Sequence, residues 1–215
     1  SKLRYLGFQE ANIIPIVSEF TKYARVVSKA EDIFYHLEAA WDAAMSGRKG
    51  PVWLDVPVDI QAEIVEVPDG RLSRYVSAKD MVRHSPAKQE LTSVANLLVQ
   101  SKRPVLMIGD EFHWTDNGES SLRHLINFMQ IPVVTEWNAH DLVSDSSLYY
   151  CGRPGTIGDR GGNYVVQSAD LVIALGCQLS LRQISFEWGN FAKEAQLIYV
   201  TCDVTELQKK TLNVD

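Results

Sequence analysis

The sequence predicts an α/β fold whose larger part is a doubly wound parallel sheet with helices on both faces, preceded by the C-terminal part of another α/β domain. Two observations support this prediction. Between residues 104 and 203, short apolar runs rich in β-branched residues recur, as is typical of strands buried on both faces. Segments whose apolar residues have helical spacing separate these runs, and parallel strands need crossover helices of this kind.

The N-terminal part predicts one helix followed by one strand. Ser28 and Glu31 form a capping-box pattern, after which apolar residues recur at helical spacing until Gly47. Residues 51–59 then form an apolar run that predicts a buried strand.

A change of composition predicts the domain boundary. From residue 62 to residue 86 the charge is mixed and no period is visible, and Pro68 and Gly70 interrupt the chain, as is typical of a linker. We therefore expect residues 1–61 to close a first domain, residues 62–86 to form a linker, and residues 87–215 to form a second domain. A truncation of that second domain at its C-terminus stays open.

The second domain is expected to alternate helices and strands. The predicted helices are residues 87–100, 118–129 and 162–168, with a helical start at Thr205, and the predicted strands are residues 104–109, 131–136, 170–176 and 196–203. Ligands of such sheets bind beyond the carboxyl ends of the strands. Those ends carry Gly109-Asp110, the loop after Glu136, Gly176-Cys177-Gln178 and Cys202-Asp203. A glycine after a strand is also common because the chain must turn there, so each one alone favours a structural role.

Residues 152–162 form a loop in which glycines recur directly before a predicted short helix. Glycine accepts a positive φ and lacks a Cβ, so main-chain N–H groups could converge there on an anion such as a phosphate. A sharp surface turn is the alternative, and the glycines alone do not decide between the two. The spacing differs from the Rossmann G-x-G-x-x-G pattern.

Composition excludes several classes of function. The 215 residues are 46% hydrophobic and carry a net charge of -6 without a block of Lys or Arg, which argues against a nucleic-acid or anionic-membrane partner. No apolar run is long enough to cross a bilayer, and the first residues do not resemble a signal peptide. Cys151, Cys177 and Cys202 lack metal-ligand spacing, so we predict no metal site and expect buried free thiols in a reducing, cytoplasmic setting.

Several ordered strings together resemble the thiamine diphosphate-dependent enzyme superfamily, specifically its acetolactate synthase-like branch. Phe8-Gln9-Glu10 followed by Thr21-Lys22, and residues 46–61 with Gly-Pro-Val-Trp-Leu-Asp-Val-Pro at their centre, are similar to the end of that family's pyrimidine-binding domain. Residues 152–159, Asn163, residues 167–171 and residues 174–176 resemble its central domain.

The resemblance implies a parent enzyme of three α/β domains that binds thiamine diphosphate and Mg²⁺ and acts on a 2-oxo acid such as pyruvate, as a homo-oligomer. It also implies that the activating glutamate lies upstream of Ser1 and that the Gly-Asp-Gly motif for the metal belongs to a third domain. We therefore expect the chain to be a fragment that is inactive alone. A fragment that starts inside a domain would expose apolar surface at Ile33, Phe34 and Trp41 and would self-associate.

In the acetolactate synthase-like branch the central domain carries FAD. By resemblance, Gly155, Thr156, Ile157 and Gly158 match the flavin-contacting loop, Gly176 matches the glycine after the next strand, and Arg48 matches an arginine that reaches the flavin. Gln178, Leu181 and Thr201 depart from the branch, whose residues there are an arginine, an aspartate and an acid. Because these departures remove charge, we expect FAD binding to be weak or absent.

The resemblance also places Phe8, Gln9, Lys22 and Arg182 in the lining of the active site. Gln9 would lie near the thiamine, and Lys22 and Arg182 would offer positive charge to a 2-oxo acid carboxylate. Without the resemblance, both basic residues would be interpreted as solvated side chains. The leading hypothesis is a fragment of a decarboxylase and carboligase. The alternative is a self-standing nucleotide-binding or assembly module, which would have no need of residues 8–61.

Overall fold

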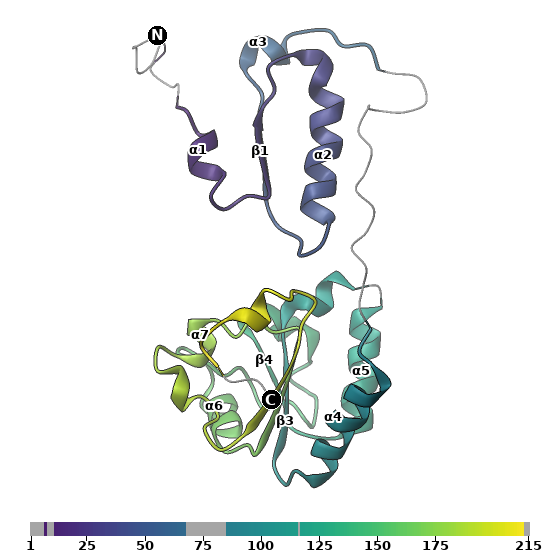
Figure 1. Ribbon diagram of the computed structural model, residues 1–215, viewed down its shortest axis with the longest axis vertical. Helices are drawn as coiled ribbons and strands as arrows, with labels where there is room; N and C mark the ends of the chain where they lie inside the picture. The colour runs from purple at the N-terminus through teal and green to yellow at the C-terminus, as the bar shows by residue number, and fades with distance from the viewer. Residues whose placement is uncertain (1–6, 8–10, 68–84, 116, 213–215) are drawn as a thin grey trace. The chain divides into compact units, whose positions relative to one another are not determined.

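The computed structural model describes residue 7 and residues 11–67, 85–115 and 117–212. The chain divides into two compact units, Ser1–Val82 and Arg83–Asp215 (Figure 1). Their border falls inside the segment 62–86 that the sequence predicts as a linker, and residues 68–84 of that segment lie outside the described residues. Phe8, Gln9 and Glu10 lie outside them as well.

The first unit is a small βαβ arrangement. Strands β1 (Tyr23–Val26) and β2 (Val52–Asp55) pair in parallel, with Tyr23 opposite Val52, and helix α2 (Ile33–Met45) connects them. The remaining elements are α1 (Ile14–Val17), the 3-10 turn η1 (Ala30–Asp32) and α3 (Val58–Gln61). Neither α1 nor β1 was predicted from the sequence.

Two local predictions in this unit are wrong. Ser28 does not cap the helix: the chain enters α2 through η1, and the N-cap residue Asp32 makes no side-chain capping bond. The strand predicted over residues 51–59 ends at Asp55, and after Pro57 the chain turns into α3. Proline lacks an N–H for a strand ladder and fits the start of a helix, so Pro57 ends the extended segment.

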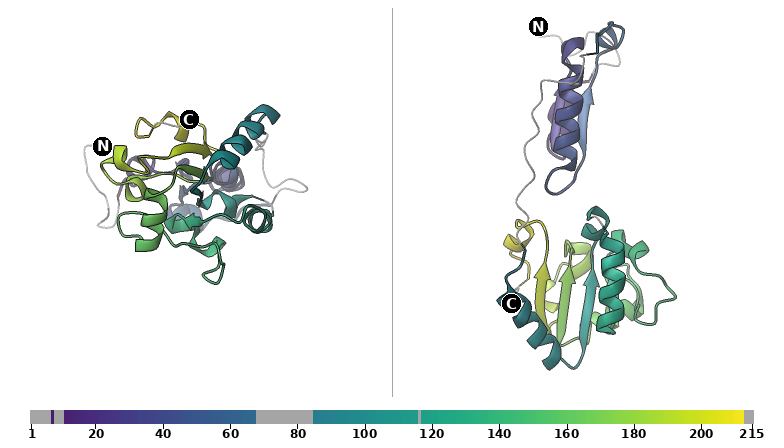
Figure 2. Two further views of the ribbon diagram at one scale, coloured as in Figure 1. Left: turned by 90° about the horizontal axis from the view of Figure 1, so that it is seen from below. Right: turned by 90° about the vertical axis from the view of Figure 1, so that its right-hand side faces the viewer.

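The second unit contains one sheet of four parallel strands in the order β4-β3-β5-β6, seen side by side in Figure 2. The strands are β3 (Pro104–Ile108), β4 (Val133–Thr135), β5 (Leu171–Leu175) and β6 (Gln196–Val200). The helices are α4 (Lys88–Gln100), α5 (Gly118–Met129), α6 (Arg160–Gln167) and α7 (Leu181–Ile184). Four 3-10 turns complete the unit: η2 (Asp110–Trp114), η3 (Trp137–Leu142), η4 (Trp188–Asn190) and η5 (Glu206–Gln208).

Alternate strand residues pack on opposite faces of this sheet. Val105 and Met107 join the core cluster that contains Val166 of α6 and Ile184 of α7, whereas Leu106 and Ile108 join the cluster that contains Leu122 of α5. Helices thus cover both faces, with α6 and α7 on one side and α4 and α5 on the other (Figure 1). The predicted doubly wound α/β fold is confirmed, and the strand runs are apolar throughout because both faces are buried.

Asp170 fixes the edge of the sheet at which the strands begin. Its carboxylate accepts a hydrogen bond from the Ser101 hydroxyl. It also accepts bonds from the N–H groups of Lys102 and Arg103, which are both 2.9 Å long. These bonds tie the end of α4 to the start of β5, and they lower the pKa of Asp170 to about 2 because they favour its charged form. The candidate functional site lies at the opposite edge, where the strands end.

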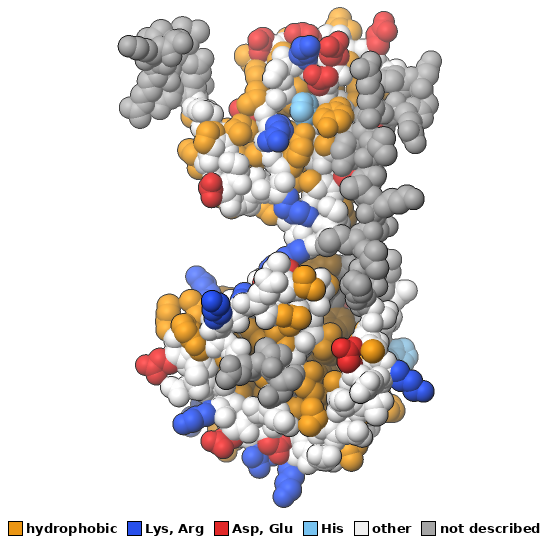
Figure 3. All heavy atoms as spheres, in the orientation of Figure 1, with side chains coloured by type: hydrophobic (Ala, Val, Ile, Leu, Met, Phe, Trp, Pro, Cys, Tyr) orange, Lys and Arg blue, Asp and Glu red, His pale blue; other side chains and the backbone are white. Residues whose placement is uncertain are grey.

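The first unit exposes several large apolar side chains. Exposed large apolar side chains of the first unit include Leu37, Trp41, Met45 and Trp53, and Figure 3 shows hydrophobic side chains exposed on this unit among charged ones. In the described part of the chain, no helix has the length and apolarity to cross a membrane. Of the three cysteines, which are all free thiols, Cys177 is buried as expected but Cys202 is exposed.

Candidate functional site at the carboxyl edge of the sheet

The close contact of two glycines shapes the carboxyl edge. From β3 the chain continues to β4 on one side of it, and then crosses to β5 and β6 on the other side. The strand order therefore reverses between β3 and β5, which is where ligands of doubly wound sheets bind. Gly109 follows β3 and Gly176 follows β5, and a Cβ on Gly109 would lie 1.9 Å from the Gly176 carbonyl oxygen. Glycine is therefore needed at position 109 because the two backbones touch each other.

Glu136, directly after β4, is a buried carboxylate at this edge. Only 8% of the residue is exposed. Its Oε1 accepts hydrogen bonds from the N–H groups of Gln178, at 3.0 Å, and Leu179, at 3.1 Å. Leu179, which adopts a left-handed φ of 46°, and Gln178 donate their successive N–H groups to the same carboxylate. Burial raises the pKa of Glu136 to about 7, against the lowering effect of these two bonds.

Glu111, in η2, reaches over the end of β5 to the end of β6. Its two carboxylate oxygens accept hydrogen bonds from the Thr201 hydroxyl, at 2.6 Å, and from the Cys202 N–H, at 2.8 Å. Gly176 allows this path, because a Cβ there would lie 2.8 Å from the Glu111 Cβ, and its φ of 62° suits glycine. The carboxylate thereby joins the ends of two strands that are not neighbours in the sheet.

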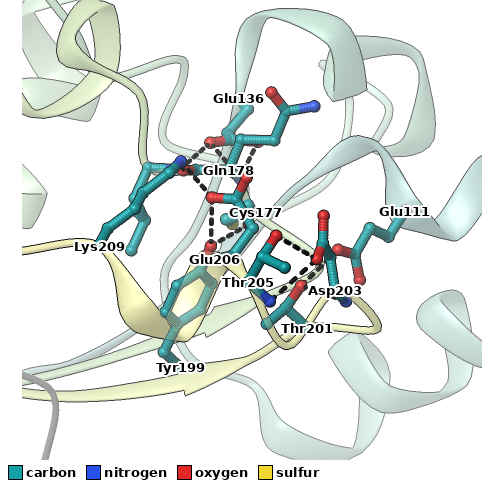
Figure 4. A network of polar contacts seen from close by, with 11 residues as sticks. Glu111, Glu136, Cys177, Gln178, Tyr199, Thr201, Asp203, Thr205, Glu206 and Lys209 are labelled. Carbon is teal, nitrogen blue, oxygen red and sulfur yellow. Dashed lines mark hydrogen bonds and ion pairs between the residues drawn. The ribbon is translucent and has the colours of Figure 1, made fainter. Parts of the chain in front are cut away.

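The chain after β6 covers the same edge (Figure 4). The Tyr199 hydroxyl donates to the Cys177 carbonyl oxygen at 2.6 Å, and Lys209 donates to the Gln178 carbonyl oxygen at 2.7 Å while pairing with Glu206. Glu206 is itself buried. In the resulting polar network, the main chain after β5 donates its N–H groups to Glu136 and accepts a hydrogen bond from Lys209.

Five main-chain N–H groups of the glycine loop are bonded within the chain. The pairs are Arg153 to the Asp159 carboxylate at 2.9 Å, Gly155 to Asn163 Oδ1 at 2.9 Å, Thr156 to the Arg182 carbonyl at 2.8 Å, Gly158 to the Gly155 carbonyl at 3.1 Å, and Asp159 to the Arg153 carbonyl at 2.6 Å. A Cβ on Gly158 would lie 2.2 Å from the Arg153 carbonyl oxygen, and Gly155 has a φ of 136°. The loop needs these glycines for its own tight turn.

A small hollow lies beside this loop. Its volume is about 130 Å³, and its lining includes Thr156, Asn163, Gln183 and Phe191. Pockets for cofactors are usually larger than roughly 300 Å³. The Gln183 side chain donates to the Pro154 carbonyl at 2.6 Å, so its amide also serves the loop.

The predicted active-site residues that the structure describes lie in different units. Lys22 donates to the carbonyl oxygens of Ser46 and Arg48, the latter at 2.9 Å, just after α2 ends. Arg182 is an exposed residue in the first half of α7, and its carbonyl oxygen accepts a hydrogen bond from the Thr156 N–H. Lys22 and Arg48 belong to the first unit and Arg182 to the second, and Phe8 and Gln9 are not described, so their joint role stays a prediction.

The three departures from the flavin-binding branch lie at or near the carboxyl edge. The Gln178 N–H donates to Glu136 and its carbonyl oxygen accepts from Lys209, and the Thr201 hydroxyl donates to Glu111. Leu181 is 40% exposed at the start of α7. Within the described ranges, no group of three or more His, Cys, Asp or Glu side chains is placed to hold a metal ion.

Sequence reasoning located the strand ends but missed the roles of Glu111 and Glu136. The signal available was an acidic residue at the end of a predicted buried strand, for Glu136, or two positions after one, for Glu111, a place where main-chain donors gather. Their partners, 42 to 91 residues later in the sequence, could not be identified from the pattern.

Comparison with known proteins agrees with this architecture. Residues 91–214 match the family model of the thiamine pyrophosphate enzyme, central domain, so the chain belongs to the thiamine pyrophosphate enzymes and the resemblance inferred from its motifs is confirmed.

Relatives of the chain include acetolactate synthases. It is 29% identical over 207 residues to a probable acetolactate synthase large subunit of Methanocaldococcus jannaschii, a match over 94% of this chain and 34% of the relative. The Escherichia coli isozyme 1 large subunit is 29% identical over 203 residues, and Zea mays acetolactate synthase 1 is 34% identical over 209 residues. The match covers 94% of this chain in both cases, and 35% and 31% of the relative. The chain thus spans about a third of the length of these curated relatives.

The described contacts do not fit an FAD diphosphate at this edge. The N–H groups of Gln178, Leu179 and Cys202 already donate to carboxylates. Those of Gly155, Thr156 and Gly158 donate to the chain's own oxygens. The two carboxylates at this edge would also repel the phosphates. The assignment of Gly155, Thr156, Ile157, Gly158 and Gly176 to a cofactor stays a prediction.

Replacement of Gly158 by valine should destabilise the second unit. The new side chain would collide with the Arg153 carbonyl, and we expect a loss of about 1–3 kcal/mol in the free energy of unfolding. A thermal melt of the variant measures it. Arg160→Ala is the matched control, because Arg160 is exposed in the next helix, whereas Arg153 pairs with Asp159. A valine variant that melts with the wild type would leave this loop an ordinary surface turn.

Glu136 should make the stability of the second unit depend on pH. The folded protein keeps this proton until about pH 7, whereas the unfolded chain loses it near the ordinary pKa of 4.5, so the folded state binds more protons in that window. The free energy of unfolding should therefore fall as pH rises from 4.5 to about 7, by on the order of 3 kcal/mol, and level off above it.

Urea unfolding followed by circular dichroism at several pH values measures this slope. Glu136→Gln cannot titrate and should lose that part of the slope, whereas Glu119→Gln, an exposed residue of α5, should keep it. Equal pH profiles of the wild type and the Glu136 variant would refute the assignment.

Proposed function

We propose that this chain is part of a thiamine pyrophosphate-dependent enzyme that decarboxylates a 2-oxo acid such as pyruvate and joins the product to a second carbonyl compound. The observation that carries the proposal is the extent of the match to acetolactate synthases. It covers 94% of the chain and therefore includes the first unit as well as the central domain. Thiamine pyrophosphate with Mg²⁺ would supply the electron sink for the decarboxylation.

The chain's own part in this reaction would be to hold the neighbouring domain and to line the active site. Phe8 and Gln9 are proposed to lie near the cofactor, and Lys22 and Arg182 to attract the carboxylate of the substrate. An ammonium group has three N–H donors, of which Lys22 gives bonds to two carbonyl oxygens. Partial burial lowers the pKa of Lys22. The two bonds to carbonyl oxygens would hold the ammonium group just after the end of α2.

We propose further that the enzyme is a homo-oligomer of the cytoplasm. In support, α2 exposes Leu37, Trp41 and Met45, with Trp41 68% exposed, and a cluster of large apolar side chains favours burial against protein. Ile33 and Phe34, which the sequence analysis also placed on this surface, are half-buried.

The alternative, a self-standing nucleotide-binding module, has less support. Such a module would need only the second unit, yet the match to acetolactate synthases extends over the first unit as well. The internally bonded glycine loop also offers a nucleotide fewer donors than the sequence suggested.

An assay of carbon dioxide release tests the proposed reaction. The complete natural protein that contains these residues should release carbon dioxide from pyruvate and form acetolactate, and both should depend on added thiamine pyrophosphate and Mg²⁺. The 215-residue chain alone should show no release above background, because it contains no Gly-Asp-Gly string for the metal and diphosphate. Turnover by the chain alone, or a complete protein without cofactor-dependent release, would contradict the proposal.

A further inference from the structure

The main-chain donors at the carboxyl edge of a doubly wound sheet are the groups that hold the phosphates of a nucleotide. In the second unit, the donors at the end of β5 are the N–H groups of Gln178 and Leu179, and the donor at the end of β6 is that of Cys202. All three bind carboxylates of this chain, at 2.8 to 3.1 Å.

The geometry of these carboxylates resembles that of a bound anion. One Glu136 oxygen collects two successive N–H groups, as an oxygen of a phosphate does in a main-chain nest. The second carboxylate, from Glu111, takes the neighbouring donor together with a hydroxyl. Glu136 comes from the end of β4 and Glu111 from the end of β3, so the two side chains reach this position from the other half of the sheet.

The glycines at this edge serve the carboxylates and the backbone. Gly109 lets the ends of β3 and β5 touch, and Gly176 leaves room for the Cβ of Glu111. Without this room Glu111 could not reach Thr201 and Cys202. The missing Cβ made Gly176 a candidate for cofactor binding, but the contact with Glu111 is sufficient to explain the glycine.

We propose that Glu111 and Glu136 are built-in substitutes for the phosphate groups of a dinucleotide, so that this central domain keeps the nucleotide-binding architecture closed and takes no FAD or other diphosphate there. Replacement of both carboxylates by a smaller neutral group should then uncover an anion site for a diphosphate. The proposal concerns only contacts within the second unit and does not depend on the proposed carboligase reaction.

The test starts with the wild-type chain. FAD titrated into it should leave the flavin fluorescence unquenched and the melting temperature unchanged, and ADP should likewise cause no shift. Tight, stoichiometric FAD binding by the wild type would overturn the proposal directly. This result needs no catalytic activity, so it is distinguishable from a failure of the proposed function.

The second arm uses the variant Glu111→Ala/Glu136→Ala with inorganic pyrophosphate as the probe. We expect the variant to melt below the wild type without ligand and to gain several degrees with pyrophosphate. The control pair is Glu119→Ala/Glu194→Ala, which removes the same charge from exposed positions and should gain no more than the wild type. Equal gains in both pairs, or none in either, would show that the carboxylates do not occupy an anion site.

Should the double variant not fold, Glu111→Ala alone decides the question. It uncovers the Cys202 N–H on an exposed residue and leaves the buried Glu136 in place. A pyrophosphate gain specific to this variant supports the proposal, and a gain no larger than that of Glu119→Ala contradicts it.

Discussion

The contact between the backbones after β3 and β5 determines the carboxyl edge of the second unit. With Gly109 against the Gly176 carbonyl, the ends of β3 and β5 are in contact at the point where the strand order reverses. Side chains must therefore pass over this contact, and the absence of a Cβ at Gly176 provides a path for Glu111. The rest of the edge, from Glu136 to the segment after β6, is arranged around this crossing.

Burying a carboxylate at this edge is costly unless donors compensate it. Glu136 obtains two N–H groups, and the raised pKa shows that they do not fully offset the loss of water. The donors in turn need an acceptor, because a buried main-chain N–H without one costs about 1–3 kcal/mol. Carboxylate and donors therefore stabilise one another, and removal of either partner leaves the other unsatisfied. The fold tolerates this arrangement because the strands beneath are buried on both faces.

The sequence predicted the sheet of the second unit well because strands buried on both faces must be apolar along their whole length. Its four strands lie where the apolar runs place them, and α5 has the bounds that its periodicity gave. Short elements set by tertiary contacts were missed: β1 has four residues and pairs with β2, and α7 is a single turn. Leu179 adopts a positive φ that its residue type does not announce. The partners of Glu111 and Glu136 are too distant in sequence for any local pattern to connect them.

A glycine after a buried strand has two physical explanations, approach of a ligand or approach of another part of the chain. Sequence cannot separate them, because both require only the missing Cβ. In this chain a Cβ at Gly109, Gly158 or Gly176 would collide with atoms of the protein, which is sufficient reason for the three glycines. Membership of the thiamine pyrophosphate enzymes therefore establishes the central fold without establishing a second cofactor on it, since a fold and the site it carries can change independently.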